Sequence, residues 1–489
     1  MLAVTDMNVT MQMLLPEIIV AATGALVLIL DLIWVRPLGA APSARPWLAY
    51  VGIAGLALAA VATVAERHTS AALFSNIFVV DPLAVFFKVL FIGIAIIVLL
   101  YSVETLPRFT RWPAEFYALM IWCTLGHMML ASSNELFTIF LSLQLTSLPL
   151  IVLIGYAKHD GRSGEAAIKY LLLVLVSTAV LLYGMSLVYG SLGTSTLPDI
   201  GAELAKRTTI GPALILGLVL LLTGFAFKIA AVPFQFWVPD VYEGAPTPVT
   251  AFLSVGSKFA GFALALRIVV TALRIDMDWH ITFGVMAALS MFFGNLSAIR
   301  QSDMKRMLAY SGIAQAGYLL VGLASLSQEG VGGLLFYTVA YGCANLAAFG
   351  VVMIVAEHTK STRIQDYAGL ARRSPLVGLS LAVALLSLGG LPLMAGFMAK
   401  FYVFVYAAKA GLIWLVAIGV MNSVISLYYY LRVVWQLYVP AGEDLGEMKV
   451  PVRSSVALTF CVAGVLTLGI FPEPVMQAAQ AAAAALFGG

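Results

Sequence analysis

The chain has 489 residues, of which 62% are hydrophobic and only 10% are charged. A soluble globular domain is about 25% charged, so the composition excludes an ordinary soluble protein. The net charge of +3 is spread over polar segments, which disfavours nucleic acid as a partner. Apolar runs of about 20 residues recur along the chain without the period-two alternation of a barrel, so we expect an all-α polytopic membrane protein.

Apolar runs bounded by Gly, Pro and charged clusters predict 14 transmembrane helices. Their approximate ranges are 13–35, 46–65, 82–103, 114–131, 134–157, 164–190, 211–240, 248–274, 280–300, 304–326, 330–357, 375–408, 411–438 and 452–472. The first run lacks the basic start and small-residue cleavage site of a secretory signal. We therefore expect it to stay in the membrane as a helix.

The 27 Lys and Arg residues are unevenly distributed between the predicted loops. With 14 spans, 17 of them lie in or beside the odd-numbered loops and six lie in or beside the even-numbered ones. By the positive-inside rule, the odd loops face the cytoplasm and both termini face the opposite side. A missed span would exchange the two sides downstream and remove this asymmetry, so the bias also supports the helix count.

Four lysines remain, and they lie inside apolar spans: Lys88, Lys228, Lys258 and Lys400. A lysine at the centre of a membrane helix costs roughly 2.5 to 3.5 kcal/mol. Desolvation favours the neutral amine, so a buried lysine can gain or lose a proton when neighbouring charge changes. We favour this functional interpretation for the last three, whereas packing or snorkelling is favoured for Lys88, which lies close to the start of its span. The possible carboxylate partners all lie near span ends: Glu17, Asp31, Glu115 and Glu135.

Two of the spans are long and interrupted. In span 211–240, Lys228 precedes Pro233, and in span 375–408, Pro392 precedes Lys400. Proline lacks the N–H that an internal turn needs but suits the first turn of a helix, so we expect broken helices, with Pro233 beginning a half-helix. The freed backbone groups should line a polar cavity. Because the breaks lie five spans apart, spans 4–8 and 9–13 are predicted to be inverted repeats.

No other chemistry is indicated by the sequence. The three cysteines, Cys123, Cys343 and Cys461, lie singly in apolar runs, and we expect them to be packing residues. Motifs for dinucleotides, phosphates or zinc proteases are missing, and the five histidines are scattered. We expect no metal, haem or iron–sulfur site and no covalent chemistry in this chain.

Four stretches carry a resemblance to a known family. They are "FKIAAVPFQFWVPDVYEGAPTPVTAFLSVGSK" (227–258), "GNLSAIRQSDMKRMLAYSGIAQAGYLLVG" (294–322), "GLPLMAGFMAKFYV" (390–403) and "LYYYLRVV" (427–434). The chain resembles the subunit N family of bacterial NADH:quinone oxidoreductase, respiratory complex I. The first stretch, with its VPDVYEGAP centre, resembles this family specifically rather than membrane transporters in general.

The resemblance implies an antiporter-like fold with 14 transmembrane helices, in which helices 7 and 12 are broken. It divides the chain into helices 1–3 (1–110), two inverted repeats (111–275 and 276–440) and helix 14 (441–489). It implies a multi-pass location in the bacterial cytoplasmic (inner) membrane with periplasmic termini. The implied activity is proton translocation coupled to quinone reduction, through Lys228, Lys258 and Lys400.

The implied partners are the other membrane-arm subunits, including neighbouring antiporter-like ones, with lipids and, indirectly, the quinone pool. FMN, iron–sulfur clusters, NADH and quinone are expected in the whole complex and not in this chain. Two alternatives stay open: a subunit of a multisubunit cation/proton antiporter, and a purely structural membrane-arm subunit.

The chain departs from the family pattern at three polar positions. Where the family usually has a helix 5 glutamate paired with the helix 7 lysine, this chain has Gln144, which cannot titrate. Glu135 is nine residues away, about 13.5 Å along a helix and out of phase, so it is a poor substitute. Gln235 and Gln315 stand where relatives sometimes have histidine, so they can bind water but cannot carry a proton as charge. We therefore expect Lys228 to have a different partner.

Overall fold

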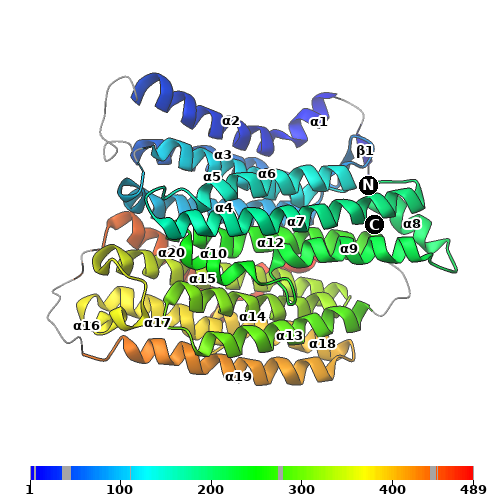
Figure 1. Cartoon of the computed structure of the whole chain (residues 1–489). Helices are drawn as coiled ribbons and strands as arrows, with labels where there is room; N and C mark the ends of the chain where they lie inside the picture. The colour runs from blue at the N-terminus through cyan, green and yellow to red at the C-terminus, as the bar shows by residue number, and fades with distance from the viewer. Residues whose placement is uncertain are drawn as a thin grey trace.

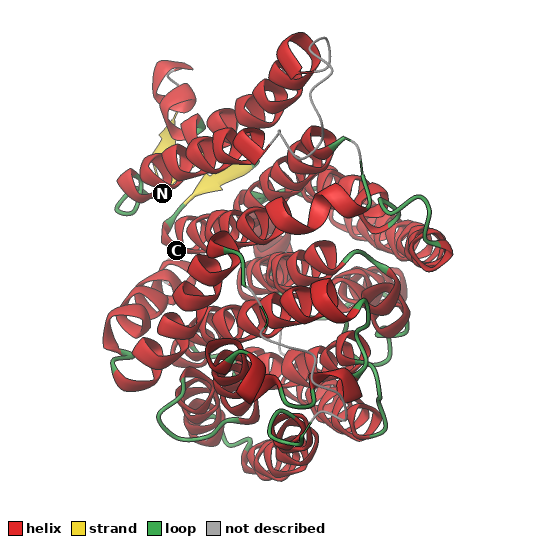
Figure 2. Ribbon diagram, turned by 90° about the vertical axis from the view of Figure 1, so that its left-hand side faces the viewer, coloured by secondary structure: helices red, strands yellow, loops and turns green. Residues whose placement is uncertain are grey.

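The computed structural model describes residues 2–4, 7–35, 46–110, 112–273, 279–440, 448 and 450–487. Its helices lie side by side in one bundle, and both ends of the chain lie at the same end of that bundle (Figure 1). Seen close to end-on, the N-terminal helices and a small sheet form one edge of the bundle (Figure 2).

The N-terminal part contains helices and a small sheet. Its helical elements are α1 (Met7–Met13), α2 (Leu15–Leu30), the π-helical turn η1 (Asp31–Val35), α3 (Pro46–Ala65), α4 (Pro82–Thr105) and η3 (Leu106–Arg108). Three short strands lie in the order β1 (Leu2–Val4), β2 (Ala71–Leu73) and β3 (Phe78–Val80), with β1 parallel to β2 and β2 antiparallel to β3. The register pairs Leu2 with Ala71 and Ala71 with Val80. The sequence did not predict this sheet.

The rest of the chain is helical throughout its described residues. The first predicted repeat holds α5 (Pro113–Ser132), α6 (Leu136–Ile154), α7 (Gly161–Leu192), α8 (Leu197–Ala205), α9 (Pro212–Ile229), α10 (Trp237–Gly244), α11 (Thr247–Phe252), η4 (Leu253–Ser257), α12 (Lys258–Arg267) and η5 (Ile268–Ala272). The second holds α13 (Trp279–Ile299), α14 (Met304–Ala324), α15 (Gln328–Thr359), η6 (Ile364–Tyr367), α16 (Leu370–Arg373), α17 (Pro375–Gly389), α18 (Ala395–Lys409) and α19 (Ile413–Gln436). Two helices follow, α20 (Val452–Ile470) and α21 (Glu473–Phe487).

The predicted all-α architecture is confirmed. Within the described residues, 13 of the spans contain a helix long and apolar enough to cross a membrane, and the twelfth is split into α17 and α18. The most central span is Thr247–Ala272, whose apolar window is completely buried, whereas only 28% of the window in Gly161–Leu192 is buried. The elements around Lys258 therefore form the core, and α7 lies at the periphery.

A buried ion pair fastens the N-terminal helices to the first repeat. Asp81 caps α4 by accepting a hydrogen bond of 2.8 Å from the backbone N–H of Ala84. Both terminal nitrogens of Arg267 donate to the same carboxylate, at 2.8 and 3.0 Å, and Arg267 Nε donates to the carbonyl of Ala131. Both side chains are only 4% exposed. A bidentate pair of this kind has a defined geometry, so it fixes the position of α4 against α12.

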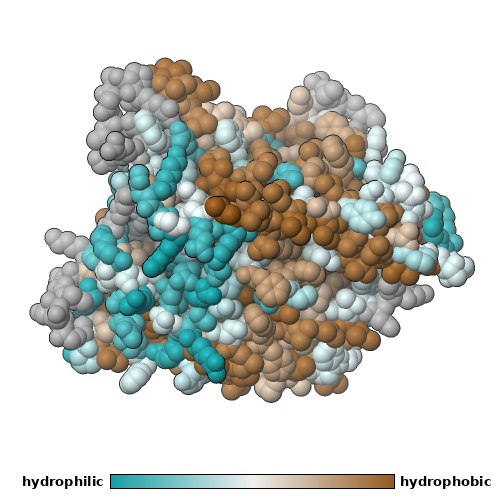
Figure 3. Space-filling view, viewed as in Figure 1, coloured by the Kyte–Doolittle hydropathy of each residue, from teal (hydrophilic) through white to brown (hydrophobic). Residues whose placement is uncertain are grey.

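Polar residues gather mainly at one end of the bundle. On the face shown in Figure 3, apolar residues cover most of the helix lengths, and the polar ones lie mainly away from the ends of the chain. Several cations used to predict the orientation lie outside the described residues: Arg36, Arg45, Arg111, Arg274 and Lys449. The predicted domain boundaries near 111, 275 and 441 fall on such segments too, so orientation and boundaries stay predictions.

The break in the twelfth span depends on two glycines. α17 ends at Gly389, and Gly390 then takes the left-handed conformation with φ 87°, which a residue without Cβ adopts at little cost. The chain turns through Pro392 and enters α18 at Ala395. A Cβ on Gly396 would lie 1.9 Å from the carbonyl oxygen of Ser387, so a glycine there lets the two half-helices touch.

We expect Gly396→Ala to destabilise this break. The added methyl group must push α18 away from α17, and overpacking of this kind costs about 1 to 3 kcal/mol. Gly93→Ala is the matched control, because a Cβ on Gly93 meets no atom within 4 Å, and alanine favours a helix by up to about 1 kcal/mol over glycine. Thermal unfolding of both variants in the detergent-solubilised protein measures the effect. Equal midpoints for the two variants would contradict the packing argument.

Candidate functional site

The break in the seventh span places Lys228 inside the bundle. Lys228 lies in the last turn of α9 and is 6% exposed, and its Nζ donates a 3.1 Å hydrogen bond to the hydroxyl of Ser147 on α6. Side chains bind the backbone groups that the break sets free. Trp237 Nε1 donates to the carbonyl of Phe227, and the N–H of Val232 donates to the hydroxyl of Ser290. The interior thus replaces the lost helical bonds, as a membrane interior requires.

The prediction that Pro233 begins a half-helix is wrong. Pro233 lies in the connecting segment between α9 and α10, and α10 begins only at Trp237. Ala230 ends α9 in the left-handed conformation, with φ 61°, so the chain has already left the helix before the proline. Gln235, from the same segment, is 3% exposed, and its Oε1 has no hydrogen-bond partner among the described residues. The proline keeps the connecting segment from forming a helix, and it does not begin one.

Lys258 occupies the most buried part of the bundle. A π-helical turn, η4, precedes it and shifts its side chain relative to a regular helix; such turns are frequent at functional sites. Lys258 is 2% exposed, and its Nζ donates to the carbonyl of Gly312 at 2.5 Å. The same Nζ lies 5.3 Å from the ring centroid of Tyr341, so a positive charge there is also stabilised by the ring.

Lys400 faces the break of the twelfth span. It is 4% exposed, and its Nζ donates to the carbonyls of Leu388 and Gly389, each at 3.1 Å. These carbonyls belong to the last turn of α17, where no later N–H of that helix can reach them. The Nζ also lies 4.4 Å from the ring centroid of Tyr318. The break therefore supplies acceptors for a buried ammonium group.

Gln315 joins the surroundings of Lys400 to those of Lys258. Its Nε2 donates to the carbonyl of Leu388, which Lys400 also contacts, and lies 3.5 Å from the hydroxyl of Tyr430. The hydroxyl of Tyr430 bonds to that of Ser311, whose neighbour Gly312 accepts from Lys258. We call this run of contacts, from Lys258 to Lys400, the polar path. Gln315 also accepts a 2.6 Å hydrogen bond from the hydroxyl of Tyr337.

Within the described residues of the first half, no carboxylate binds Lys228. Gln144 is half-buried on α6, three residues before the Ser147 that binds Lys228. Glu135 is the N-cap of that helix and accepts hydrogen bonds from the N–H and the hydroxyl of Thr138. It is held at the helix end, as its predicted phase suggested. The hydrogen-bond partners of all three central lysines are a hydroxyl and backbone carbonyls, not carboxylates.

Sequence reasoning missed His127, which lies near Lys228. His127 is fully buried on α5 between the rings of Phe91 and Phe252, with centroids 5.2 and 5.4 Å away. Its Nδ1 has no hydrogen-bond partner among the described residues, and its Nε2 lies 3.9 Å from the thiol of Cys123. The thiol of Cys123 donates to the carbonyl of Thr146, whose neighbour Ser147 binds Lys228. A histidine near the middle of an apolar span was the signal that could have identified it.

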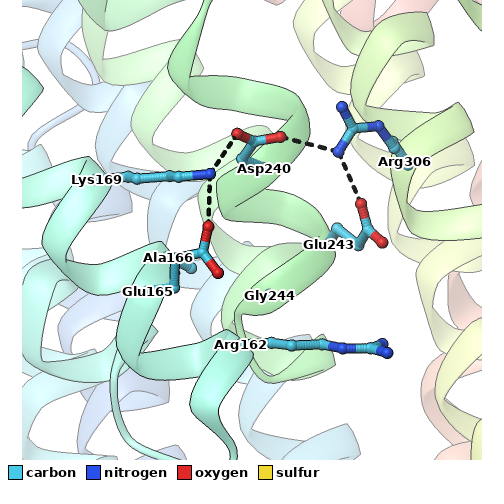
Figure 4. Close-up of a pocket in the computed structure, with 8 residues that line it drawn as sticks. All are labelled: Arg162, Glu165, Ala166, Lys169, Asp240, Glu243, Gly244 and Arg306. Atoms are coloured by element: carbon cyan, nitrogen blue, oxygen red, sulfur yellow. Dashed lines mark hydrogen bonds and ion pairs between the residues drawn. The ribbon is translucent and has the colours of Figure 1, made fainter.

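The VPDVYEGAP stretch has a structural use at the polar end of the bundle. Figure 4 shows Asp240 between Lys169 of α7 and Arg306 of α14, with Nζ and Nη1 at 2.8 and 2.9 Å from its carboxylate. Glu243 binds the same arginine at 2.7 Å, and Glu165 binds the lysine at 2.8 Å. All five side chains are partly exposed, so solvent screens the pairs and each contributes little to stability. The network orients α10 against its neighbours.

No metal centre is found in the described ranges, where no three His, Cys, Asp or Glu side chains are placed to hold an ion. All three cysteines are free, and Cys123 donates to the carbonyl of Thr146 as a packing residue. Lys88 is fully buried, with Nζ 2.6 Å from a carboxylate oxygen of Glu17, so of the two alternatives favoured for it, packing and snorkelling, the structure has packing.

Comparisons with known proteins agree on one family. Residues 133–426 match the family model described as NADH:quinone oxidoreductase/Mrp antiporter, TM. The chain is 41% identical over 483 residues to NADH-quinone oxidoreductase subunit N of Trichlorobacter lovleyi, covering 97% of each chain. It is 42% identical over 481 residues to the subunit of that name from Moorella thermoacetica, covering 98% of this chain and 99% of the relative.

Solved structures separate fold from family. A chain of respiratory complex I from Thermus thermophilus with bound aureothin is 31% identical, with a TM-score of 0.78, over 94% of this chain and 98% of that one. A chain of the Mrp complex from Dietzia sp. has a higher TM-score, 0.86, over 98% of each chain, but is only 20% identical, so it shows the fold alone. The complex I chain and the Mrp chain share this fold, whereas the sequence identities distinguish between the two classes. The chain therefore belongs to the NADH-quinone oxidoreductase subunit N family and has the antiporter-like membrane fold.

Proposed function

We propose that the chain is a proton-translocating, non-redox subunit in the membrane arm of a bacterial NADH-quinone oxidoreductase. The observation that carries this proposal is the polar path, which joins two buried lysines through the centre of an otherwise apolar bundle. Membership of the subunit N family supports the assignment to this complex. The positive-inside distribution supports a location in the cytoplasmic membrane with both termini on the periplasmic side.

Opposing effects at each lysine suit a proton relay. Burial disfavours the ammonium form, whereas the carbonyl acceptors and the rings of Tyr341 and Tyr318 favour it. When the two effects nearly balance, a change of charge nearby is enough to add or remove a proton. Protonation of Lys258 and of Lys400 would then be linked through the electrostatic interaction between them in a medium of low dielectric constant.

The hydroxyl groups of the polar path supply the exchangeable protons. Ser311 and Tyr430 each donate and accept, so they can pass a proton along a hydrogen-bonded chain that includes water. Gln315 cannot carry the charge, because an amide does not titrate near neutral pH. Its role is to orient: it holds the hydroxyls of Tyr337 and Tyr430 and binds the carbonyl that Lys400 shares.

In the first half, Lys228 has a neutral partner in Ser147, and the buried imidazole of His127 is connected to this site through Cys123, which donates to the carbonyl of Thr146 beside Ser147. These neighbours, rather than a carboxylate on α6, would set how readily Lys228 takes up a proton. Gln235, with its unpaired carbonyl oxygen in the break, can bind water there. The two halves would then transfer protons through different side chains.

The alternative functions differ in the subunits and cofactors that would co-purify with the chain. In our proposal FMN, iron–sulfur clusters, NADH and quinone bind to partner subunits, and neighbouring antiporter-like subunits flank this one. Purification of the chain by an affinity tag from its native membrane should bring flavin and iron–sulfur absorbance with it. Purification of a multisubunit cation/proton antiporter would bring neither. Absence of both chromophores from an intact, multisubunit preparation would favour the antiporter.

We expect Lys400→Met to impair energy-coupled quinone reduction and proton pumping in membrane vesicles by at least about tenfold, which corresponds to about 1.4 kcal/mol. Methionine keeps the length and apolar packing of the side chain but cannot take up a proton. Lys409→Met is the matched control, because Lys409 lies in the last turn of the same helix and is exposed. Full pumping by an assembled Lys400→Met complex would instead support a purely structural subunit.

The variant Gln144→Glu tests which neighbours set the protonation of Lys228 in the first half. Residues 144 and 147 lie one turn apart on α6, so a carboxylate at 144 would approach Lys228 and favour its charged form. We expect the pH profile of proton pumping to move to higher pH, with quinone reductase activity retained. Gln144→Asn, which adds no charge, should leave the profile unmoved. An unchanged profile in Gln144→Glu would show that a carboxylate at this position does not set the behaviour of this half.

A further inference from the structure

A second group of buried charges lies outside the antiporter-like repeats, in the N-terminal helices. Glu17 is in the first turn of α2, Glu66 follows the last residue of α3, and Lys88 is in the second turn of α4. The helices α2, α3 and α4 alternate in direction (Figure 1), so these three positions lie towards the same end of the bundle, where Lys88 contacts Glu17 and Phe78 of β3. The residues precede the segment that matches the family model, which begins at residue 133.

The three side chains are shielded from solvent. Lys88 is fully buried, and Glu17 and Glu66 are 6% and 9% exposed. Phe78 of β3 covers the site, with its ring centroid 5.5 Å from Lys88 Nζ. Lys88 Nζ and Glu17 Oε1 are 2.6 Å apart, but the contact is not aligned as a hydrogen bond. Both oxygens of Glu17 and Oε2 of Glu66 therefore remain without a hydrogen-bond donor among the described residues.

The charges of the three groups do not cancel. Two carboxylates and one ammonium group give a net charge of −1 when all are ionised, and an uncompensated charge is costly away from water. Burial raises the pKa of Glu66 to about 7; the charge of Glu17 adds to this, and that of Lys88 opposes it. These are the charged side chains of the neighbouring helices α2 and α4 that act on Glu66 within the described residues. Arg67 and His68, which follow Glu66, are exposed and bind each other.

We propose that Glu17, Glu66 and Lys88 form a proton-binding site, distinct from the three central lysines, which exchanges one proton with the aqueous phase through Glu66. Uptake of a proton neutralises Glu66 and leaves the Lys88–Glu17 pair, so the cluster becomes electrically neutral. Release leaves it with a charge of −1. Glu66 is the exchanging group because it lies beyond the helix end, where a turn closed by the N–H of Thr69 leads to exposed residues.

The protonation of Glu66 can be tested through the chemical reactivity of its carboxyl group. A hydrophobic carbodiimide reacts with protonated carboxyl groups in apolar surroundings, and mass spectrometry of the digested chain measures the modified fraction at each glutamate. In the intact membrane complex we expect the labelling of Glu66 to fall as pH rises through about 7. Labelling of Glu66 that is confined to pH values below about 5, as for an exposed glutamate, would overturn the proposal.

Variants test whether the three groups act together. Glu17→Gln removes a negative charge, so half-labelling of Glu66 should move to lower pH, whereas Lys88→Met removes a positive charge and should move it to higher pH. Glu203→Gln is the control, because Glu203 forms an exposed pair with Lys206 and should leave the midpoint unmoved. If the pH of half-labelling of Glu66 is the same in Glu17→Gln as in the unmodified chain, the proposal that the three groups act together is overturned. The titration of the unmodified chain decides the proposal even if Lys88→Met fails to assemble.

Discussion

An ammonium group inside a membrane protein must find its acceptors within the protein, because hydrocarbon offers none. Regular helices supply few of them, since each carbonyl already accepts a bond within the helix and has only its second lone pair left. The broken helices resolve this conflict. Lys400 binds two carbonyls that the end of α17 leaves free, whereas Lys258, which follows the π-helical turn η4, binds the carbonyl of Gly312 inside the continuous helix α14. Irregular backbone and buried charge therefore depend on each other here.

This dependence explains the glycines and hydroxyls around the lysines. A Cβ on Gly312 would lie 3.0 Å from Lys258 Nζ, and one on Gly390 would lie 3.0 Å from the side chain of Lys400. Small residues thus allow an amine to reach backbone oxygen. The hydroxyls of Ser311 and Tyr430 then fill the space between the two sites with groups that both donate and accept. The second half of the chain is organised around such neutral polar groups.

The N-terminal helices pose the opposite electrostatic problem. There the bidentate pair of Asp81 with Arg267 balances its charges and ties α4 to the core. Glu17 and Lys88 form a second pair close by, but Glu66 adds a carboxylate with no matching cation in the part of the chain that the structure describes. A balanced pair is suited to holding helices together, and an unbalanced cluster is suited to binding a proton. The two sites therefore have different uses although both are buried.

Several features could be predicted from the sequence because they depend on local chemistry. Hydrophobic length determines the number of spans, and proline and glycine determine where a helix must stop; the lysines at 228, 258 and 400 were identified by their cost alone. The tertiary structure decided which atoms meet. Ser147, Gly312 and Tyr318 reach the lysines from other helices, and Glu17 reaches Lys88 from α2.

The features that the sequence left open or did not predict have the same origin. Packing and snorkelling were both open for Lys88, and the contacts with Phe78 of β3 and Glu17 of α2 decide for packing. Strands of three residues are too short to give a period-two pattern, so the sheet was not predicted. His127 was passed over because only packing with Phe91, Phe252 and the neighbourhood of Lys228 gives it a role. The sequence by itself determined where charge and backbone breaks occur, and the tertiary structure decided their partners, because a partner is a matter of spatial proximity between distant segments.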